Sequence, residues 1–283
     1  MPGAGNPHME GSEFMTQQFD NLFSIKGKIA LVTGGSRGIG EMIAAGFLAH
    51  GAKVYISSRK AEACEATAKR LSESYGAECI ALPADLSQLS GVESLAKQLS
   101  ERESRLYILV NNAGAAWGAP LEQFPEAGWD KVMDTNVKAV FFLTQKVLPL
   151  LRRAASAASP ARVINIGSID GLKTPIFDTP SYAASKAAVH HLTRFMAGQL
   201  TKEHILFNAI APGPFPTWML STGVGFGGKT ENVDWSEIAK RNPSGRVGTP
   251  QDIAGLAIFL CSRAGEYVVA QTIACDGGVV GTS

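Results

Sequence analysis

Ile29-Ala-Leu-Val-Thr33-Gly-Gly-Ser-Arg-Gly-Ile-Gly40 joins a short apolar run to a glycine-rich segment, and a helical pattern follows over Gly40–His50. The run Ile29–Thr33 predicts a buried strand. Glycines at positions 34, 38 and 40 permit a tight turn and a close approach of a pyrophosphate to the backbone. The spacing Gly-x-x-x-Gly-x-Gly is not the G-x-G-x-x-G fingerprint, so an ordinary glycine-rich turn is the alternative. The position at a strand–helix junction favours phosphate binding, because a helix N-terminus offers free N–H groups to an anion.

The same alternation of strand and helix continues along the chain. A helix is predicted over Glu62–Tyr75, and further strands over Val54–Ser57, Cys79–Leu82, Leu106–Val110, Val163–Ile166, Leu206–Ala209 and Thr272–Ala274. This spacing predicts an α/β fold with a doubly wound parallel sheet and helices on both faces. We expect a single domain over residues 15–283, because no linker divides the chain, and an expression-vector scar over residues 1–14. The stretch Pro212–Val247 is long for a connection and rich in Gly and Pro, which predicts a substrate lid over residues 217–246.

The composition argues against several classes of partner. The chain has 283 residues, 45% of them hydrophobic and 18% charged, with a formal net charge of +1. A nearly neutral chain gives no reason to expect nucleic acid or an acidic membrane as a partner, and no apolar run is long enough to span a bilayer. The four cysteines, Cys64, Cys79, Cys261 and Cys275, lack the spacing of a metal site or a disulfide framework. We therefore expect no metal, reduced thiols and a cytoplasmic location.

The residues after the second strand predict which dinucleotide binds. Sites that bind the ribose 2′-hydroxyl of NAD usually place Asp or Glu there, whereas this chain has Arg59. Arg37 projects from the glycine segment towards the same region. Two guanidinium groups can grip a 2′-phosphate, which an acid would repel. The sequence therefore predicts NADPH/NADP+ as the cofactor, the alternative being two surface arginines.

Tyr182 and Lys186 are spaced to share one face of a helix, and Ser168 precedes them. An ammonium beside a phenol favours the phenolate and lowers the phenol pKa from its ordinary value of about 10. A tyrosine tuned in this way can exchange a proton near neutral pH. Many helices contain a Tyr-x-x-x-Lys pair by chance, so a half-buried tyrosine beside a solvated lysine is the alternative for the pair alone.

The ordered set of motifs carries a resemblance. Thr33-Gly-x-x-x-Gly-x-Gly40, Asn111-Asn-Ala-Gly114, Asn136, Ser168, Tyr182-x-x-x-Lys186 and Pro212-Gly213 follow one another in this order. The set resembles the short-chain dehydrogenase/reductase family, from about Ser24 to Gly278. Within the family, segments such as Leu148–Arg153 and Ala161–Ser168 resemble the branch of 3-oxoacyl reductases of rhamnolipid biosynthesis.

The resemblance implies a single-domain Rossmann-type enzyme that transfers hydride to a carbonyl group. It implies that Tyr182 is the general acid, that Ser168 bonds the carbonyl oxygen, that Lys186 tunes Tyr182 and binds the ribose, and that Asn136 holds a relay water. The implied cofactor-binding set is Gly34, Ser36, Arg37, Gly38, Ile39, Gly40, Arg59, Asp85, Leu86, Asn112, Ala113, Gly114, Tyr182, Lys186, Pro212, Gly213 and Thr217. It also implies a homotetramer, with the long helices after the fourth and fifth strands at one interface and the C-terminal segment at the other.

The substrate is less clearly indicated. Trp117, Asp170, Phe177 and Trp218 are candidates for the pocket wall, and an apolar pocket suits a ketone or aldehyde with hydrophobic substituents. Reductases that act on acyl carrier protein resemble one another in two arginines that meet the acidic carrier, and this chain has Ala155 and Glu203 at those positions. We therefore rank a broad NADPH-dependent carbonyl reductase first and a 3-oxoacyl-[acyl-carrier-protein] reductase second. A catalytically silent NADP-binding sensor is the third hypothesis.

Overall fold

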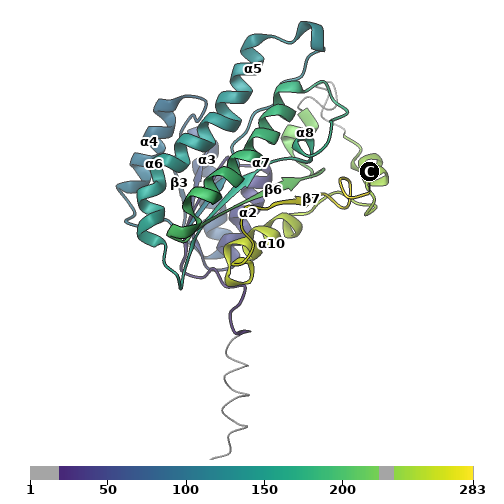
Figure 1. The fold of residues 1–283 in the computed structure, drawn as a ribbon. Helices are drawn as coiled ribbons and strands as arrows, with labels where there is room; N and C mark the ends of the chain where they lie inside the picture. The colour runs from purple at the N-terminus through teal and green to yellow at the C-terminus, as the bar shows by residue number, and fades with distance from the viewer. Residues whose placement is uncertain (1–18, 223–232, 283) are drawn as a thin grey trace, which may run out of the picture.

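A seven-stranded parallel sheet forms the centre of the computed structural model, which describes residues 19–222 and 233–282 (Figure 1). The strand order is β3-β2-β1-β4-β5-β6-β7. The strands are β1 (Ile29–Thr33), β2 (Lys53–Ser57), β3 (Cys79–Ala81), β4 (Ile108–Asn111), β5 (Ala161–Ile166), β6 (Ile205–Pro212) and β7 (Thr272–Cys275). The predicted strands are confirmed, with ends that differ by at most three residues. The predicted scar at residues 1–14 lies outside the described residues.

Helices cover both faces of the sheet, as the strand–helix alternation predicts. One face carries α2 (Gly38–Ala49), α3 (Ala61–Tyr75) and α10 (Pro250–Cys261), and the other carries α4 (Leu89–Ser100), α6 (Ala139–Ala154) and α7 (Pro180–Leu200). Side chains alternate between the two faces along a strand. In β1, Ala30 and Val32 accordingly pack in the hydrophobic core under α2, α3 and α10, whereas Leu31 packs in the core under α4, α6 and α7. The doubly wound Rossmann-type fold is confirmed.

The shorter elements gather where the strands end. After β4 come a 3-10 turn at Leu121–Gln123, α5 (Glu126–Met133) and a π-helical stretch over Asp134–Lys138 that runs into α6. After β6 come α8 (Trp218–Thr222) and α9 (Trp235–Arg241). In a parallel sheet all strands present their carboxyl ends at one edge, and ligands bind there. This edge therefore holds the glycine segment, Ser168 and the start of the predicted lid.

The sequence predicts neither a membrane-spanning helix nor a metal site. Within residues 19–222 and 233–282, no helix is long and apolar enough to cross a membrane. In the same ranges, no three His, Cys, Asp or Glu side chains are grouped so that they could hold a metal ion. Cys64, Cys79 and Cys261 are buried and Cys275 is partly exposed.

Candidate active site

The glycine segment forms the turn between β1 and α2, and its shape depends on missing side chains. Gly34 and Gly38 have backbone φ angles of +65° and +59°, which residues other than glycine rarely adopt. At Gly40, a Cβ atom would overlap the Gly34 carbonyl and the Asn112 amide. Arg37, at the N-cap of α2, forms no side-chain cap hydrogen bond. The segment is thus a closely packed cradle at an uncapped helix N-terminus, which suits a pyrophosphate.

Asn112 and Thr33 lock this cradle to the end of β4. The Asn112 side chain donates to the carbonyl oxygens of Thr33 at 2.8 Å and Gly34 at 3.3 Å. The Thr33 hydroxyl accepts from the backbone N–H groups of Asn112 and Ala113, at 2.9 and 3.0 Å. These bonds fix the expected cofactor residues Asn112, Ala113 and Gly114 beside the glycine segment.

The two predicted arginines lie close enough to influence each other. Burial and the positive charge of Arg59 lower the pKa of Arg37. A site with two adjacent guanidinium groups attracts an anion.

Asp85 and Leu86, the residues expected to meet the adenine, follow β3. Asp85 is exposed and its carboxylate accepts hydrogen bonds from the backbone and hydroxyl of Ser87, at 3.0 and 2.8 Å. Leu86 is buried behind it, at 6% exposure.

Ser168, Tyr182 and Lys186 come together at the carboxyl edge of β5. Ser168 follows β5, and its hydroxyl accepts from the Asp170 backbone at 3.1 Å. The Lys186 ammonium is buried and donates to the Ile166 carbonyl at 2.8 Å, with Nζ 5.4 Å from the centroid of the Tyr182 ring. Pro180 starts α7, so Tyr182 and Lys186 occupy its first two turns, on one face as the spacing predicts.

The expected lowering of the Tyr182 pKa does not occur in this structure. Burial raises the pKa of Tyr182 to about 12, the Ser168 hydrogen bond lowers it in part, and the Asp170 charge raises it further. Burial also lowers the pKa of Lys186 to about 8, against the opposite influence of Asp170. The spacing places the ammonium near the phenol, but the sequence does not reveal how strongly burial opposes charge on both groups.

Asn136 lies in the π-helical stretch Asp134–Lys138 and is buried, at 1% exposure. Its amide nitrogen donates to the Ala115 carbonyl and the Ser185 hydroxyl, both at 2.9 Å, and its amide oxygen accepts from the Ala115 backbone at 2.8 Å. Asn136 therefore ties the chain after β4 to α7. The sequence did not predict this π-helical stretch, a feature that recurs at functional sites.

The four candidate pocket residues have different neighbours among the described residues. The Trp117 ring lies against Gly128 of α5, with Lys131 Nζ 5.2 Å from its centroid. Trp218 lies over Arg37, with the guanidinium carbon 4.0 Å from the ring centroid. Asp170 is half-buried near Tyr182 and Lys186, and burial raises its pKa. Phe177 is half-buried, and its carbonyl accepts from the Thr179 backbone at 2.8 Å.

The chain after β6 begins beside the glycine segment. A Cβ atom at Gly213 would approach Asp276 Cα to 2.7 Å, and one at Gly38 would lie 3.4 Å from the Thr217 methyl group. The backbone N–H of Gly213 donates to the Cys275 carbonyl at 3.0 Å, which ties Pro212 and Gly213 to β7. Thr217 therefore adjoins the expected cofactor cradle. Of the predicted lid, residues 223–232 lie outside the described residues.

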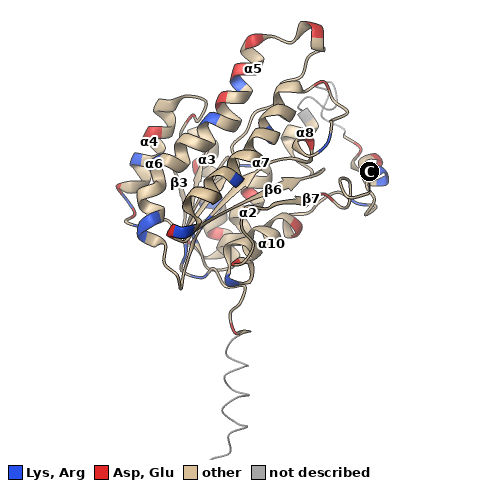
Figure 2. Ribbon diagram, in the orientation of Figure 1, with Lys and Arg blue, Asp and Glu red and all other residues tan. Residues whose placement is uncertain are grey.

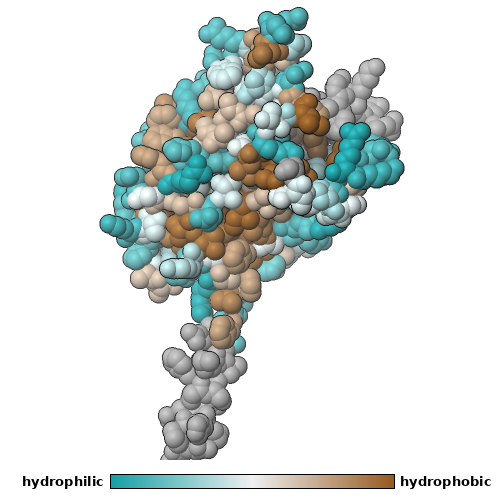
Figure 3. All heavy atoms as spheres, turned by 45° about the vertical axis from the view of Figure 1, so that its right-hand side comes forward, coloured by the Kyte–Doolittle hydropathy of each residue, from teal (hydrophilic) through white to brown (hydrophobic). Residues whose placement is uncertain are grey.

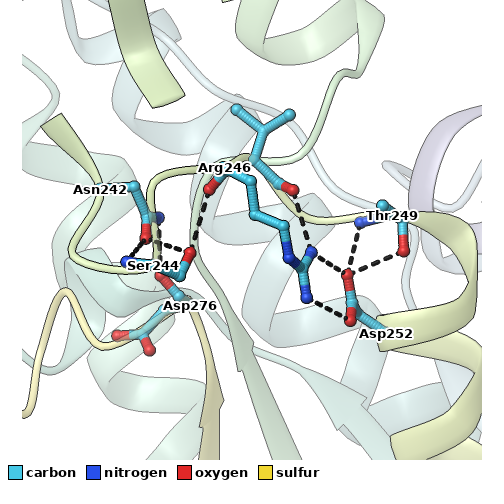
Figure 4. A network of polar contacts seen from close by, with 7 residues as sticks. Asn242, Ser244, Arg246, Thr249, Asp252 and Asp276 are labelled. Carbon is cyan, nitrogen blue, oxygen red and sulfur yellow. Dashed lines mark hydrogen bonds and ion pairs between the residues drawn. The ribbon is translucent and has the colours of Figure 1, made fainter. Parts of the chain in front are cut away.

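A polar network fixes the return of this segment to the sheet (Figure 4). Arg246 pairs with both carboxylate oxygens of Asp252, at 2.6 and 2.9 Å, and Asp252 also caps α10 through Thr249. The Asn242 amide bridges the Ser244 backbone and the Asp276 carbonyl, at 3.0 and 2.9 Å. The network borders a cavity of about 290 Å³ that none of Asn136, Ser168, Tyr182 and Lys186 lines. It therefore anchors the far end of the segment without joining the catalytic cluster.

His190 lies beside the site, four residues after Lys186 on α7, and from the sequence we expect it to serve packing or to lie at the surface. It is 3% exposed, and its ring fills the space beside Gly167 and Gly171, which flank Ser168. Burial and the Lys186 charge lower the pKa of His190 to about 4. The packing interpretation fits this position. The only sequence signal was its helical spacing of one turn from Lys186, which did not show what the ring touches.

Comparisons with known proteins agree with this architecture. The family model described as enoyl-(acyl carrier protein) reductase matches residues 34–280. The rhamnolipids biosynthesis 3-oxoacyl-[acyl-carrier-protein] reductase of Pseudomonas aeruginosa is 52% identical over 256 residues, which are 90% of this chain and 97% of that protein. Gluconate 5-dehydrogenase of Gluconobacter oxydans is 36% identical over 92% of this chain and 97% of that protein.

Solved structures give the same result. The Pseudomonas aeruginosa RhlG/NADP active-site complex superposes with a TM-score of 0.85 at 50% identity, covering 91% of this chain and 98% of that one. L-Sorbose reductase of Gluconobacter frateurii, complexed with NADPH and L-sorbose, has a TM-score of 0.82 at 27% identity, covering 93% and 100%. With a family model matched over most of its length and relatives aligned almost end to end, the chain belongs to the short-chain dehydrogenase/reductase family of oxidoreductases.

Proposed function

We propose that this oxidoreductase reduces a ketone to a secondary alcohol with NADPH. The observation that carries the proposal is the meeting of Ser168, Tyr182 and the buried Lys186 at the sheet edge that also holds the glycine cradle. When bound, NADPH supplies the hydride that adds to the carbonyl carbon. The oxygen then gains negative charge, and this chain must supply hydrogen-bond donors and a proton to it.

Tyr182 is the proton donor in this proposal. A phenol whose pKa is raised to about 12 keeps its proton at neutral pH, which suits an acid that acts only as charge develops on the substrate oxygen. In the free chain the Ser168 hydroxyl bonds the Tyr182 side chain. With substrate bound, it donates its single hydrogen to the carbonyl oxygen instead. The phenolic O–H bond breaks as the alcohol O–H bond forms.

Lys186 and Asn136 restore that proton. Lys186 uses one N–H on the Ile166 carbonyl. We assign its other two N–H groups to the ribose hydroxyls and to Tyr182. Because both amide hydrogens of Asn136 are already donated to Ala115 and Ser185, we assign the relay water to its main-chain carbonyl. A proton can then pass from solvent through this water to Lys186 and on to Tyr182.

The residues present fit NADPH. A Cβ atom at Gly40 would fill the glycine cradle. This cradle, with Ser36, Ile39 and the N-terminus of α2, would hold the pyrophosphate. Arg37, whose pKa the neighbouring Arg59 charge lowers, would hold the 2′-phosphate together with Arg59. The adenine is assigned to Asp85 and Leu86, the ribose to Asn112–Gly114 with Lys186, and the nicotinamide to Pro212, Gly213 and Thr217. The complexes of relatives with NADP and NADPH support this assignment.

A Tyr182→Phe variant tests the chemistry separately from binding. It should reduce ketones at least about 100-fold more slowly, because general acid catalysis contributes that much, while its Kd for NADPH stays within about twofold. NADPH oxidation with a panel of ketones and fluorescence titration of NADPH give the two readings. Equal activity would refute Tyr182 as the acid, and no ketone reduction by the unmutated chain would favour the catalytically silent NADP-binding sensor.

A second candidate is the reduction of 3-oxoacyl thioesters, which the 52% identity to a rhamnolipids biosynthesis 3-oxoacyl-[acyl-carrier-protein] reductase favours. The carrier itself has weaker support. Glu203, at a position where carrier-dependent relatives are expected to have an arginine, pairs with Arg152 through bonds of 2.6 and 3.0 Å and neutralises its charge. A competition assay of a 3-oxoacyl carrier protein against the matching coenzyme A thioester and a simple β-keto ester separates the cases. A preference above about 100-fold for the carrier would reverse our ranking.

A further inference from the structure

Arg37 contacts the chain after β6 as well as facing Arg59. Its guanidinium carbon lies 4.0 Å from the centre of the Trp218 ring, a cation–π distance. Trp218 is the first residue of α8 and is 56% exposed, so it does not serve the hydrophobic core. The preceding residue, Thr217, adjoins Gly38 of the cradle. Two consecutive residues of one segment therefore rest on the expected cofactor site.

The contact with Trp218 leaves Arg37 able to bind an anion. A guanidinium group carries five N–H donors. Contact with one aromatic ring does not use all of them. The positive charge of Arg59 nearby repels Arg37. The indole ring restrains Arg37 against that repulsion and so presets the direction of its donors.

We propose that Trp218 is a specificity-determining residue for the phosphorylated cofactor. Through its cation–π contact with Arg37, it holds the guanidinium where, together with Arg59, it binds an adenosine 2′-phosphate. The segment that starts at Thr217 thereby recognises the phosphate that distinguishes NADPH from NADH. This inference rests on the proposed function only in taking NADPH as the cofactor.

Adenosine 2′,5′-bisphosphate and adenosine 5′-monophosphate are probes that need no catalysis. Calorimetric titration of the full chain gives the gain in affinity due to the 2′-phosphate. A Trp218→Leu variant keeps an apolar side chain but loses the ring, so it should bind the bisphosphate roughly three- to fivefold more weakly, the effect of an exposed cation–π contact. Its affinity for the monophosphate should not change. Trp218→Phe should lie between the two.

Trp129→Leu is the matched control, because Trp129 is also exposed, at 41%, but lies on α5. It should bind both probes like the unmutated chain. Steady-state assays should show a higher KM for NADPH, and an unchanged KM for NADH, in Trp218→Leu alone.

The possible outcomes separate the two proposals. If Trp218→Leu binds both probes as the unmutated chain does, or loses affinity for both equally, the role of Trp218 is refuted while the choice of cofactor stands. If the unmutated chain does not distinguish the two probes, the assignment of NADPH fails first.

Discussion

At the scale of single residues, His190 is a buried side chain that packs against the segment holding Ser168 and has a lowered pKa. Its ring packs against Gly167 and Gly171 on either side of Ser168, and its pKa falls to about 4. Neither ring nitrogen has a partner of good hydrogen-bonding geometry among the described residues. The folded chain therefore holds this imidazole in its neutral form, as a spacer that fixes the Ser168 turn.

A buried neutral histidine makes stability depend on pH. The unfolded chain binds a proton at His190 with a pKa near 6.5, whereas the folded chain does so only near 4. The contribution of His190 to stability is therefore fully present above about pH 6.5 and is lost as the pH falls towards 4. At pH 4.5 the loss relative to pH 7 should be about 2–3 kcal/mol.

Urea unfolding at both pH values, at one protein concentration, measures this loss. A His190→Leu variant lacks the titrating group and should show a smaller difference between the two pH values. His191→Leu is the control, because its neighbour His191 is exposed and should leave the difference unchanged. An equal pH dependence in all three proteins would contradict the assignment.

At the scale of elements, the β1–α2 connection combines a fold requirement with a binding requirement. Gly40 lies inside α2, where glycine normally costs stability relative to alanine. Here a Cβ atom would overlap the Gly34 carbonyl and the Asn112 amide, so the close packing needs glycine. Gly255 lies inside α10, is exposed, and has nothing within 4 Å of a Cβ atom.

The two glycines predict opposite effects of the same substitution. Gly40→Ala should lower the free energy of unfolding by roughly 1–3 kcal/mol through overpacking, and should weaken NADP+ binding. Gly255→Ala should raise the free energy of unfolding by up to about 1 kcal/mol and leave NADP+ binding unchanged. Thermal unfolding and calorimetric titration provide both values. If Gly40→Ala changed neither the free energy of unfolding nor the affinity for NADP+, the cradle would be looser than its contacts indicate.

Much of this architecture could be predicted from sequence, because local patterns encode it. Every predicted strand is present, since apolar runs such as Ile29–Thr33 and Val163–Ile166 are buried on both faces of a parallel sheet. The meeting of Ser168, Tyr182 and Lys186 follows from helical spacing and motif order. The rest depends on contacts between distant segments, which spacing does not encode. Trp218 was expected in the substrate pocket, and only the folded chain places it on Arg37.

At the scale of the whole molecule, two of the exposed surfaces among the described residues bear on assembly. The first is on α7, where Phe195 is 57% exposed. The second is the free edge of the sheet at β7, whose residue Ala274 is exposed. Figure 3 shows hydrophobic side chains gathered across the middle of one face. By contrast, charged side chains of both signs are scattered over the outer helices (Figure 2). Open sheet edges and apolar helix faces are common sites of association.

These two surfaces match the two interfaces that the family resemblance implies, so we predict a homotetramer. The unmutated chain should have four times the chain mass by light scattering. Phe195→Asp would bury an unpaired charge in the helical interface, and Ala274→Asp would do so at the β7 edge, so each variant should give dimers. The double variant should be monomeric.

Tyr75→Asp is the control for these variants. Tyr75 ends α3 away from both surfaces and is 44% exposed, so this variant should remain tetrameric. A monomeric unmutated chain at micromolar concentration would refute both interfaces, and a tetrameric double variant would place them elsewhere.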